Sequence, residues 1–108
     1  MNIYKLSNGI TCLLNNLPTY ESISCKLIVK IGAIYENSHE KGLSHLLEHM
    51  VFKGTTQYKS TYELTSLLDS YGIIYNAETS TNYTSYYGKT YSNQNNIKLL
   101  LTILCELV

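Results

Sequence analysis

The sequence predicts an α+β fold in which a mostly antiparallel sheet packs on one side against helices. Short runs rich in β-branched residues are separated by turn residues such as Asn8-Gly9, a strong signal for a two-residue hairpin. Other stretches carry apolar residues at the three- and four-residue spacing of an amphipathic helix. The chain has 108 residues, which suits a single domain covering residues 1–108.

Five strands are expected, and they cover residues 3–6, 10–15, 22–31, 73–79 and 83–91. Pro18 follows the second strand and Gly32 ends the third, because both residue types interrupt a ladder. The polar turn 80–82 joins the last two strands into a hairpin. We expect the three N-terminal strands and this hairpin to lie in one sheet.

Three helices are also expected. The second begins at Ser60, which has capping-box spacing to Glu63, and it ends at Gly72. The first covers about residues 42–53, where apolar side chains recur on one face: Leu43, Leu46, Leu47, Met50 and Val51. We expect this stripe to be buried, so that the other side of the helix faces a cavity or solvent.

The third helix starts near Ser92 or Asn93, and its apolar stripe continues to the last residue, Val108. No glycine, asparagine or basic residue marks its end. Two interpretations stay open. The helix frays at the chain terminus, or a longer protein has been shortened inside or just after this helix.

The charges and the hydropathy pattern exclude several classes of protein. Eight lysines balance eight acidic residues, so the formal net charge is zero and no basic stripe is present. Nucleic acid and acidic membrane surfaces are therefore not expected as partners. No apolar run approaches the roughly 20 residues of a membrane span, and the N-terminus lacks the pattern of a signal peptide. These observations favour a cytoplasmic protein.

The three cysteines are Cys12, Cys25 and Cys105, and none belongs to a Cys-x-x-Cys motif. Each lies beside apolar residues. We therefore expect buried free thiols in a reducing compartment.

The segment His45-Leu46-Leu47-Glu48-His49 has the residue types of a zinc site. Two histidines four residues apart lie only about 40° apart around a helix, so both imidazoles can reach one metal ion. Glu48 flanks the same face, where a carboxylate can take a proton from water and pass it to a leaving amine. The alternative is a solvated helix face that carries these residues by chance, because short motifs have frequent false positives.

The surrounding residues favour the zinc site. Residues 42–55 read Gly-Leu-Ser-His-Leu-Leu-Glu-His-Met-Val-Phe-Lys-Gly-Thr and closely resemble the motif of the insulinase/pitrilysin (M16) zinc metallopeptidases, the inverzincins. Four more segments resemble family motifs in the same order: Asn8-Gly9-Ile10, Gly32-Ala33-Ile34-Tyr35-Glu36, Asn76-Ala77-Glu78-Thr79-Ser80 and Thr84-Ser85-Tyr86-Tyr87. The resemblance covers nearly the whole chain.

This resemblance implies an incomplete M16 domain and the activity of a zinc-dependent metalloendopeptidase. Carried over position by position, it implies that His45 and His49 are Zn²⁺ ligands and that Glu48 is the general base that acts on zinc-bound water. It also implies that Asn76 and Ala77 line the cleft and pair their backbone with an extended substrate, which is a peptide or an unfolded protein.

The resemblance further implies a third zinc ligand, a glutamate roughly 75 residues beyond the second histidine. That position lies beyond Val108, so we expect the N-terminal part of a peptidase that is truncated before this ligand. Glu106 does not match the ligand by alignment. Glu78, His39 and Cys25 are the candidates to replace it, because a catalytic zinc normally has three protein ligands.

Two other functions stay open. The chain could be a catalytically inactive fragment, or it could be a module that binds a peptide or a partner through an exposed strand edge. A second chain could also complete the domain. Apolar surface that the missing part of the domain leaves uncovered favours dimerisation or aggregation.

Overall fold

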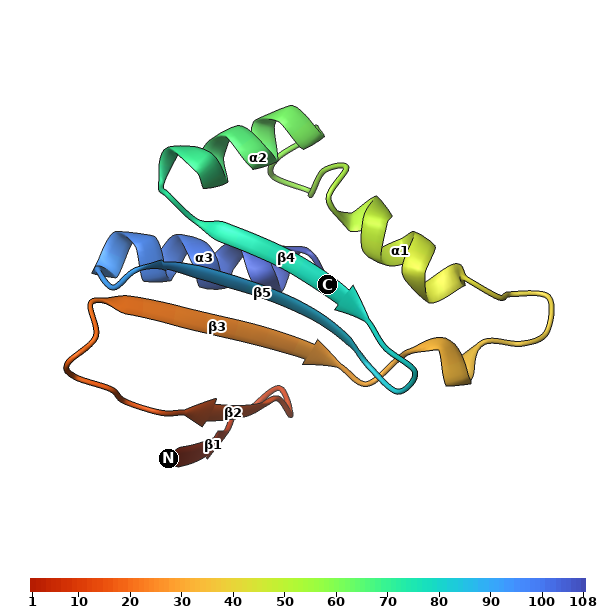
Figure 1. Cartoon of the computed structure of the whole chain (residues 1–108), viewed down its shortest axis with the longest axis horizontal. Coiled ribbons are helices and arrows are strands. Elements are labelled where there is room, and N and C mark those ends of the chain that lie inside the picture. Colours follow the sequence, from red (N-terminus) through yellow and green to blue (C-terminus); the bar gives the residue numbers. More distant parts are fainter.

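The computed structural model describes residues 1–108 and confirms the α+β fold. Five strands, three α-helices and one short 3-10 helix follow one another along the chain (Figure 1). In order they are β1 (Asn2–Lys5), β2 (Thr11–Leu14), β3 (Ser22–Val29), the 3-10 helix η1 (Ala33–Tyr35), α1 (Leu43–Val51), α2 (Thr61–Ser70), β4 (Ile74–Thr79), β5 (Thr84–Tyr91) and α3 (Gln94–Glu106).

The strands form two antiparallel sheets, so the prediction of one sheet is wrong. The main sheet has the order β3-β5-β4, and Tyr86 of the central strand pairs with Leu27 on one side and Ala77 on the other. The hairpin β1-β2 forms a sheet of its own. Every residue of both hairpin strands is exposed, so the hairpin has no buried face that would hold it beside β3 in the main sheet.

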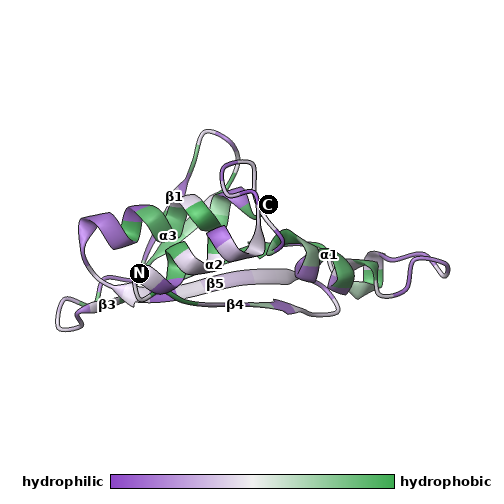
Figure 2. Ribbon diagram, turned by 90° about the horizontal axis from the view of Figure 1, so that it is seen from above, coloured by the Kyte–Doolittle hydropathy of each residue, from purple (hydrophilic) through white to green (hydrophobic).

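The core lies between the main sheet and two helices. Figure 2 shows α2 and α3 over the same face of the sheet. Their apolar side chains meet Tyr86 of β5 in one cluster of buried residues: Leu64, Leu68, Ile73, Tyr86, Leu100, Ile103, Leu104 and Leu107. Asn96 is buried at the start of α3, where its side-chain amide donates to Thr90 Oγ1 and to the Tyr71 carbonyl. The alternating strand pattern and the helical stripes of the sequence thus share one core.

Helix α2 begins and ends as predicted. Ser60 Oγ accepts a 3.1 Å hydrogen bond from the backbone N–H of Glu63. At the other end Gly72 adopts a φ of +66°, which glycine reaches without steric cost. The N–H of Gly72 donates to Asp69 and that of Ile73 to Leu68, each at 3.0 Å, which is the Schellman pattern. This ending leads the chain directly into β4 and fixes where that strand starts.

Helix α1 is oriented differently from the prediction. Leu43, Leu46, Leu47 and Met50 are between 51% and 58% exposed, so the expected burial is wrong for these four residues, and Val51, the fifth of the stripe, is partly buried against the core. The one buried residue of α1 is Glu48. Figure 1 shows α1 beside the end of β4 rather than over the core, and α1 contacts β4 and η1. Helical periodicity groups the leucines on one face but does not say where that face points.

All three cysteines are free thiols, as predicted, but their expected burial is wrong. Cys12 is exposed on the separate β1-β2 hairpin, and Cys105 is exposed on α3. Cys25 is half-buried, and this burial raises its pKa.

None of the three helices has the length and apolar character needed to cross a bilayer.

Candidate active site

Helix α1 brings His45, Glu48 and His49 into one cluster. The Nε2 atoms of the two histidines lie 3.0 Å apart, and the possible ligand atoms of all three residues lie within 4.8 Å of one another. Two imidazole nitrogens bound to a tetrahedral zinc at about 2.0–2.1 Å would be about 3.3 Å apart. The two nitrogens are therefore close to the spacing that one zinc ion requires, and the donor set fits this metal.

The three side chains differ in exposure. His45 and His49 are exposed, whereas Glu48 is only 8% exposed. Two exposed imidazoles remain accessible to a metal ion and to a substrate. A buried carboxylate needs a hydrogen-bond partner, because unpaired burial of a charge is costly.

Thr79, the last residue of β4, supplies that partner. Its hydroxyl Oγ1 donates a hydrogen bond to Glu48 Oε2 across the contact between α1 and β4. The buried Tyr86 of β5 lies near the same carboxylate. Burial, and to a smaller extent the negative charge of Glu48, raise the pKa of the Tyr86 hydroxyl.

Glu36 holds the other end of α1. Gly42 precedes the helix and has no side chain to cap it, but the Glu36 carboxylate accepts from the N–H groups of Gly42 at 2.9 Å and Ser44 at 2.7 Å. These are free donors of the first helical turn, where a negative charge also interacts favourably with the helix dipole. Both hydrogen bonds lower the pKa of Glu36, and the one from Ser44 contributes most.

The segment before Glu36 is attached to the turn between β4 and β5. The N–H groups of Ala33 and Ile34 donate to the carbonyls of Ser80 and Thr81 at 3.2 and 2.9 Å. Gly32 lies so close to this turn that an added Cβ would stand 2.4 Å from the Ser80 carbonyl oxygen. The β4-β5 hairpin therefore positions α1 twice, through Thr79 and through η1 and Glu36.

Asn76 and Ala77 lie outside this cluster, on β4. In the sheet order β4 is an edge strand that pairs with β5 on one side only. The backbone N–H of Ala77 donates to Asn76 Oδ1 at 2.8 Å, so this N–H points toward the free edge of the sheet. The backbone of Ala77 thus faces the free edge, whereas the backbone of Asn76 faces Tyr87 of β5 and only its side chain lies beside that edge.

The three candidates for a further metal ligand do not join the cluster. Successive side chains of a strand point to opposite faces of the sheet. Because Thr79 points toward α1, its neighbour Glu78 points to the other face. There Glu78 lines a pocket of about 450 Å³. Cys25 belongs to β3, which is separated from β4 by β5.

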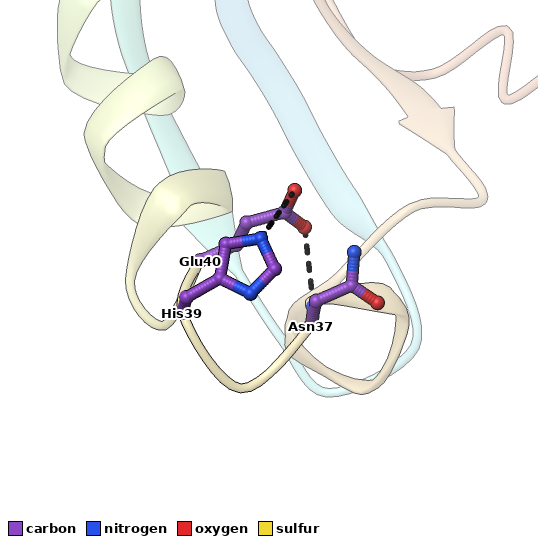
Figure 3. Close-up of polar contacts among 3 residues, drawn as sticks. All are labelled: Asn37, His39 and Glu40. Carbon is purple, nitrogen blue, oxygen red and sulfur yellow. Dashed lines mark hydrogen bonds and ion pairs between the residues drawn. The ribbon is translucent and has the colours of Figure 1, made fainter.

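His39 lies in the loop before α1 and is paired with its neighbour. Figure 3 shows its ring beside the Glu40 carboxylate, with Nε2 and Oε1 3.9 Å apart. The other oxygen of Glu40 accepts from the backbone N–H of Asn37 at 3.1 Å (Figure 3). The cluster of possible ligands consists of His45, Glu48 and His49 alone.

Thr79 and Glu36 are the contacts of the site that sequence reasoning did not single out. Both lie in segments quoted above for their family resemblance, residues 76–80 and 32–36. Neither has a spacing to the motif that indicates contact. Thr79 is 31 residues from Glu48, and only the position of β4 brings the two together.

Comparison with known proteins supports the same family. The family model of insulinase, peptidase family M16, matches residues 11–108. The chain is 42% identical over 107 residues to an uncharacterized zinc protease of Rickettsia felis, which covers 99% of this chain and 25% of that protein. It is 40% identical over 83 residues to human insulin-degrading enzyme, covering 77% of this chain and 8% of the enzyme.

Solved structures agree with these sequence matches. The crystal structure of a protease from Helicobacter pylori superimposes with a TM-score of 0.83 at 28% sequence identity, over 98% of this chain and 25% of that one. The chain spans a quarter or less of the length of these relatives. A match over residues 11–108, a shared fold and a His-x-x-Glu-His helix together show that the chain belongs to the insulinase (M16) family of peptidases.

Proposed function

We propose that the cluster on α1 is the metal-binding part of a zinc-dependent metalloendopeptidase site, with His45 and His49 as ligands and Glu48 as the general base. The separation of 3.0 Å between the two histidine Nε2 atoms, with the carboxylate beside them, supports this proposal best. A bound zinc ion supplies a Lewis acid that polarises the scissile carbonyl and activates water. Glu48 takes a proton from that water and returns it to the leaving amine.

The proposed substrate is a peptide or an unfolded protein segment bound as an extended strand. The free edge of β4 offers main-chain hydrogen bonds at Ala77, beside the side chain of Asn76, and such bonds are the usual basis of strand addition. In this binding mode the side-chain oxygen of Asn76 gives up the Ala77 N–H to the substrate carbonyl. The carboxylate and the imidazoles lie on the helix that contacts this same strand.

We further propose that residues 1–108 act as one part of a larger peptidase domain. Two histidines leave zinc with fewer protein ligands than the three of a typical catalytic site. The relatives are about four times longer or more, so a third ligand belongs to a segment or second chain that completes the domain. The free cysteines support a reducing, cytoplasmic location for this protein.

The second candidate is a binding module without catalysis. It is favoured by the two free edges of the main sheet, at β3 and β4, which can accept an extended chain whether or not a metal is present. This candidate and the peptidase differ in their need for Glu48 and zinc.

Zinc binding and peptide cleavage by the purified chain test the proposal. We expect weak binding of one zinc ion, lost in His45→Ala and in His49→Ala and kept in the control His39→Ala. Cleavage by the wild-type chain should be very slow alone and should rise when the completing segment of a relative is added. Glu48→Gln should keep the zinc and abolish this cleavage. Zinc binding that is unchanged in His45→Ala would contradict the ligand assignment. If the wild-type chain binds peptide without cleaving it, and this binding survives in His45→Ala, His49→Ala and Glu48→Gln, the result would favour the binding module.

A further inference from the structure

The carboxylate of Glu48 has two chemical roles open to it. Its possible ligand atom lies within 4.8 Å of those of His45 and His49, close enough for the carboxylate to become a metal ligand itself. A carboxylate that ligates the metal is a weaker base, because the metal withdraws charge from its oxygens. The site therefore needs a feature that holds the carboxylate in one orientation.

Thr79 is the residue that has this position. It lies on the helix-facing side of β4, and its hydroxyl donates to Oε2 of Glu48. Glu48 is 8% exposed, so water competes little for this oxygen. With Oε2 engaged by a neutral donor, one oxygen remains free to receive a proton, and the carboxyl group no longer rotates freely about its last bond.

We propose that Thr79 is a positioning residue that keeps Glu48 acting as a base and prevents it from ligating the metal held by His45 and His49. This inference rests on the function proposed above. It assigns to Thr79 a role that a hydrogen bond between the half-buried Thr79 and the buried Glu48 does not by itself require. Hydrogen bonds from neighbouring residues to the side chains of a metal site commonly fix the orientation of those side chains.

A spectroscopic test uses Co²⁺, whose visible spectrum reports the ligands around the ion. We expect the wild-type chain and Thr79→Ser to give the same spectrum, because serine keeps the hydroxyl. Thr79→Val keeps the volume and removes the donor, so Glu48 is released to ligate. The spectrum should then change, and Co²⁺ should bind several-fold more tightly in equilibrium dialysis. Adding Glu48→Gln to Thr79→Val should restore the wild-type spectrum, and the control Thr11→Val on the distant hairpin should not alter it.

A second test needs no metal. Thermal unfolding of Thr79→Val, Glu48→Leu and the double variant forms a double-mutant cycle. The double variant should lose less in melting temperature than the sum of the two single losses, because each single change leaves the other polar group, buried Glu48 or half-buried Thr79, without its partner. Additive losses would overturn the proposed contact. In the control cycle, Thr11→Val and Glu48→Leu should be additive.

The outcomes separate this inference from the proposed function. Co²⁺ binding by the wild-type chain with an unchanged spectrum in Thr79→Val overturns the role of Thr79 and leaves the metal site standing. A wild-type chain that binds no Co²⁺ overturns the proposed function and, with it, the positioning role.

Discussion

The backbone N–H of Ser44 donates a 2.7 Å hydrogen bond to Oε2 of Glu36, and Ser44 is the residue immediately before His45. Val51, at the C-terminal end of helix α1, is partly buried against the core, and the rest of the apolar stripe is exposed. Its N-terminal turn is held by Glu36 and its buried side by Thr79. Polar contacts from outside the helix, together with the packing of Val51, therefore hold the segment that carries the two histidines.

Replacing Glu36 by alanine should loosen the first turn of α1. The N–H groups of Gly42 and Ser44 would lose their acceptor, and the helix would lose a favourable negative charge at its N-terminus. We expect faster amide hydrogen exchange at Ser44 and weaker zinc binding by His45 and His49. The control is Glu40→Ala, which removes a half-exposed carboxylate of the same loop that accepts from Asn37 and not from the helix. Equal exchange rates at Ser44 in both variants would show that Glu36 does not cap the helix.

The same contact makes α1 sensitive to acid. The pKa of Glu36 is lowered from its ordinary value of 4.5 by the hydrogen bonds from Ser44 and Gly42. Because the folded-state pKa lies below the unfolded value, ionised Glu36 stabilises the helix at pH values above 4.5. This contribution is lost as the pH falls through the folded-state pKa.

Hydrogen exchange at Ser44 measured between neutral pH and about pH 3 checks this sign, after correction for the intrinsic pH dependence of exchange. The wild-type chain should lose protection as the pH falls below the ordinary glutamate value. Glu36→Gln keeps an acceptor and has no charge to lose, so its protection should change less. A steeper acid loss in Glu36→Gln than in the wild type would contradict the assignment.

Gly32→Ala should destabilise the chain and disturb the site. The new Cβ would lie 2.4 Å from the Ser80 carbonyl oxygen and 2.6 Å from that of Thr81, and both are backbone atoms that cannot rotate away. We expect a loss of about 1–3 kcal/mol in the free energy of unfolding, as for other overpacked sites. Urea denaturation gives this value. Gly9→Asn is the control, because Gly9 has open space around it and asparagine tolerates its positive φ.

Two leucines separate core packing from the exposed stripe of α1. Leu68 is 1% exposed and Leu46 is 57% exposed. Leu68→Ala should cost about 2–5 kcal/mol in the free energy of unfolding, whereas Leu46→Ser should change it by less than about 0.5 kcal/mol. Because large exposed apolar patches favour association, Leu46→Ser should reduce self-association in sedimentation experiments. Similar losses of stability in both variants would show that Leu46 is buried in solution.

Local signals predicted the parts of the fold that depend on neighbouring residues. The Ser60 cap and the Gly72 ending of α2 follow from a few adjacent residues and formed as expected. Asn93 likewise caps α3, where its side chain accepts from the N–H of Asn96. These features need no information from distant parts of the chain.

Arrangements that depend on distant contacts were not predicted. The expectation that Leu46 and Leu47 are buried failed because helical spacing groups residues without placing the helix against a partner. The prediction of a single five-stranded sheet failed because the alternation of apolar and polar residues predicts a strand but not which strand lies beside it. His45, Glu48 and His49 lie about one helical turn apart, so their spacing alone predicts that they cluster, whereas the contact of Glu48 with Thr79 depends on the position of β4.

The alternation of side chains along β4 also limits which insertions and deletions this region can accept. Gly72 fixes the start of the strand, and Thr79 reaches Glu48 from its far end. Adding one residue between them would turn Glu78 toward α1 in place of Thr79. Two carboxylates would then face each other beside the histidines, and their repulsion would push the helix away. The length of this segment is therefore constrained more strictly than the identity of most residues within it.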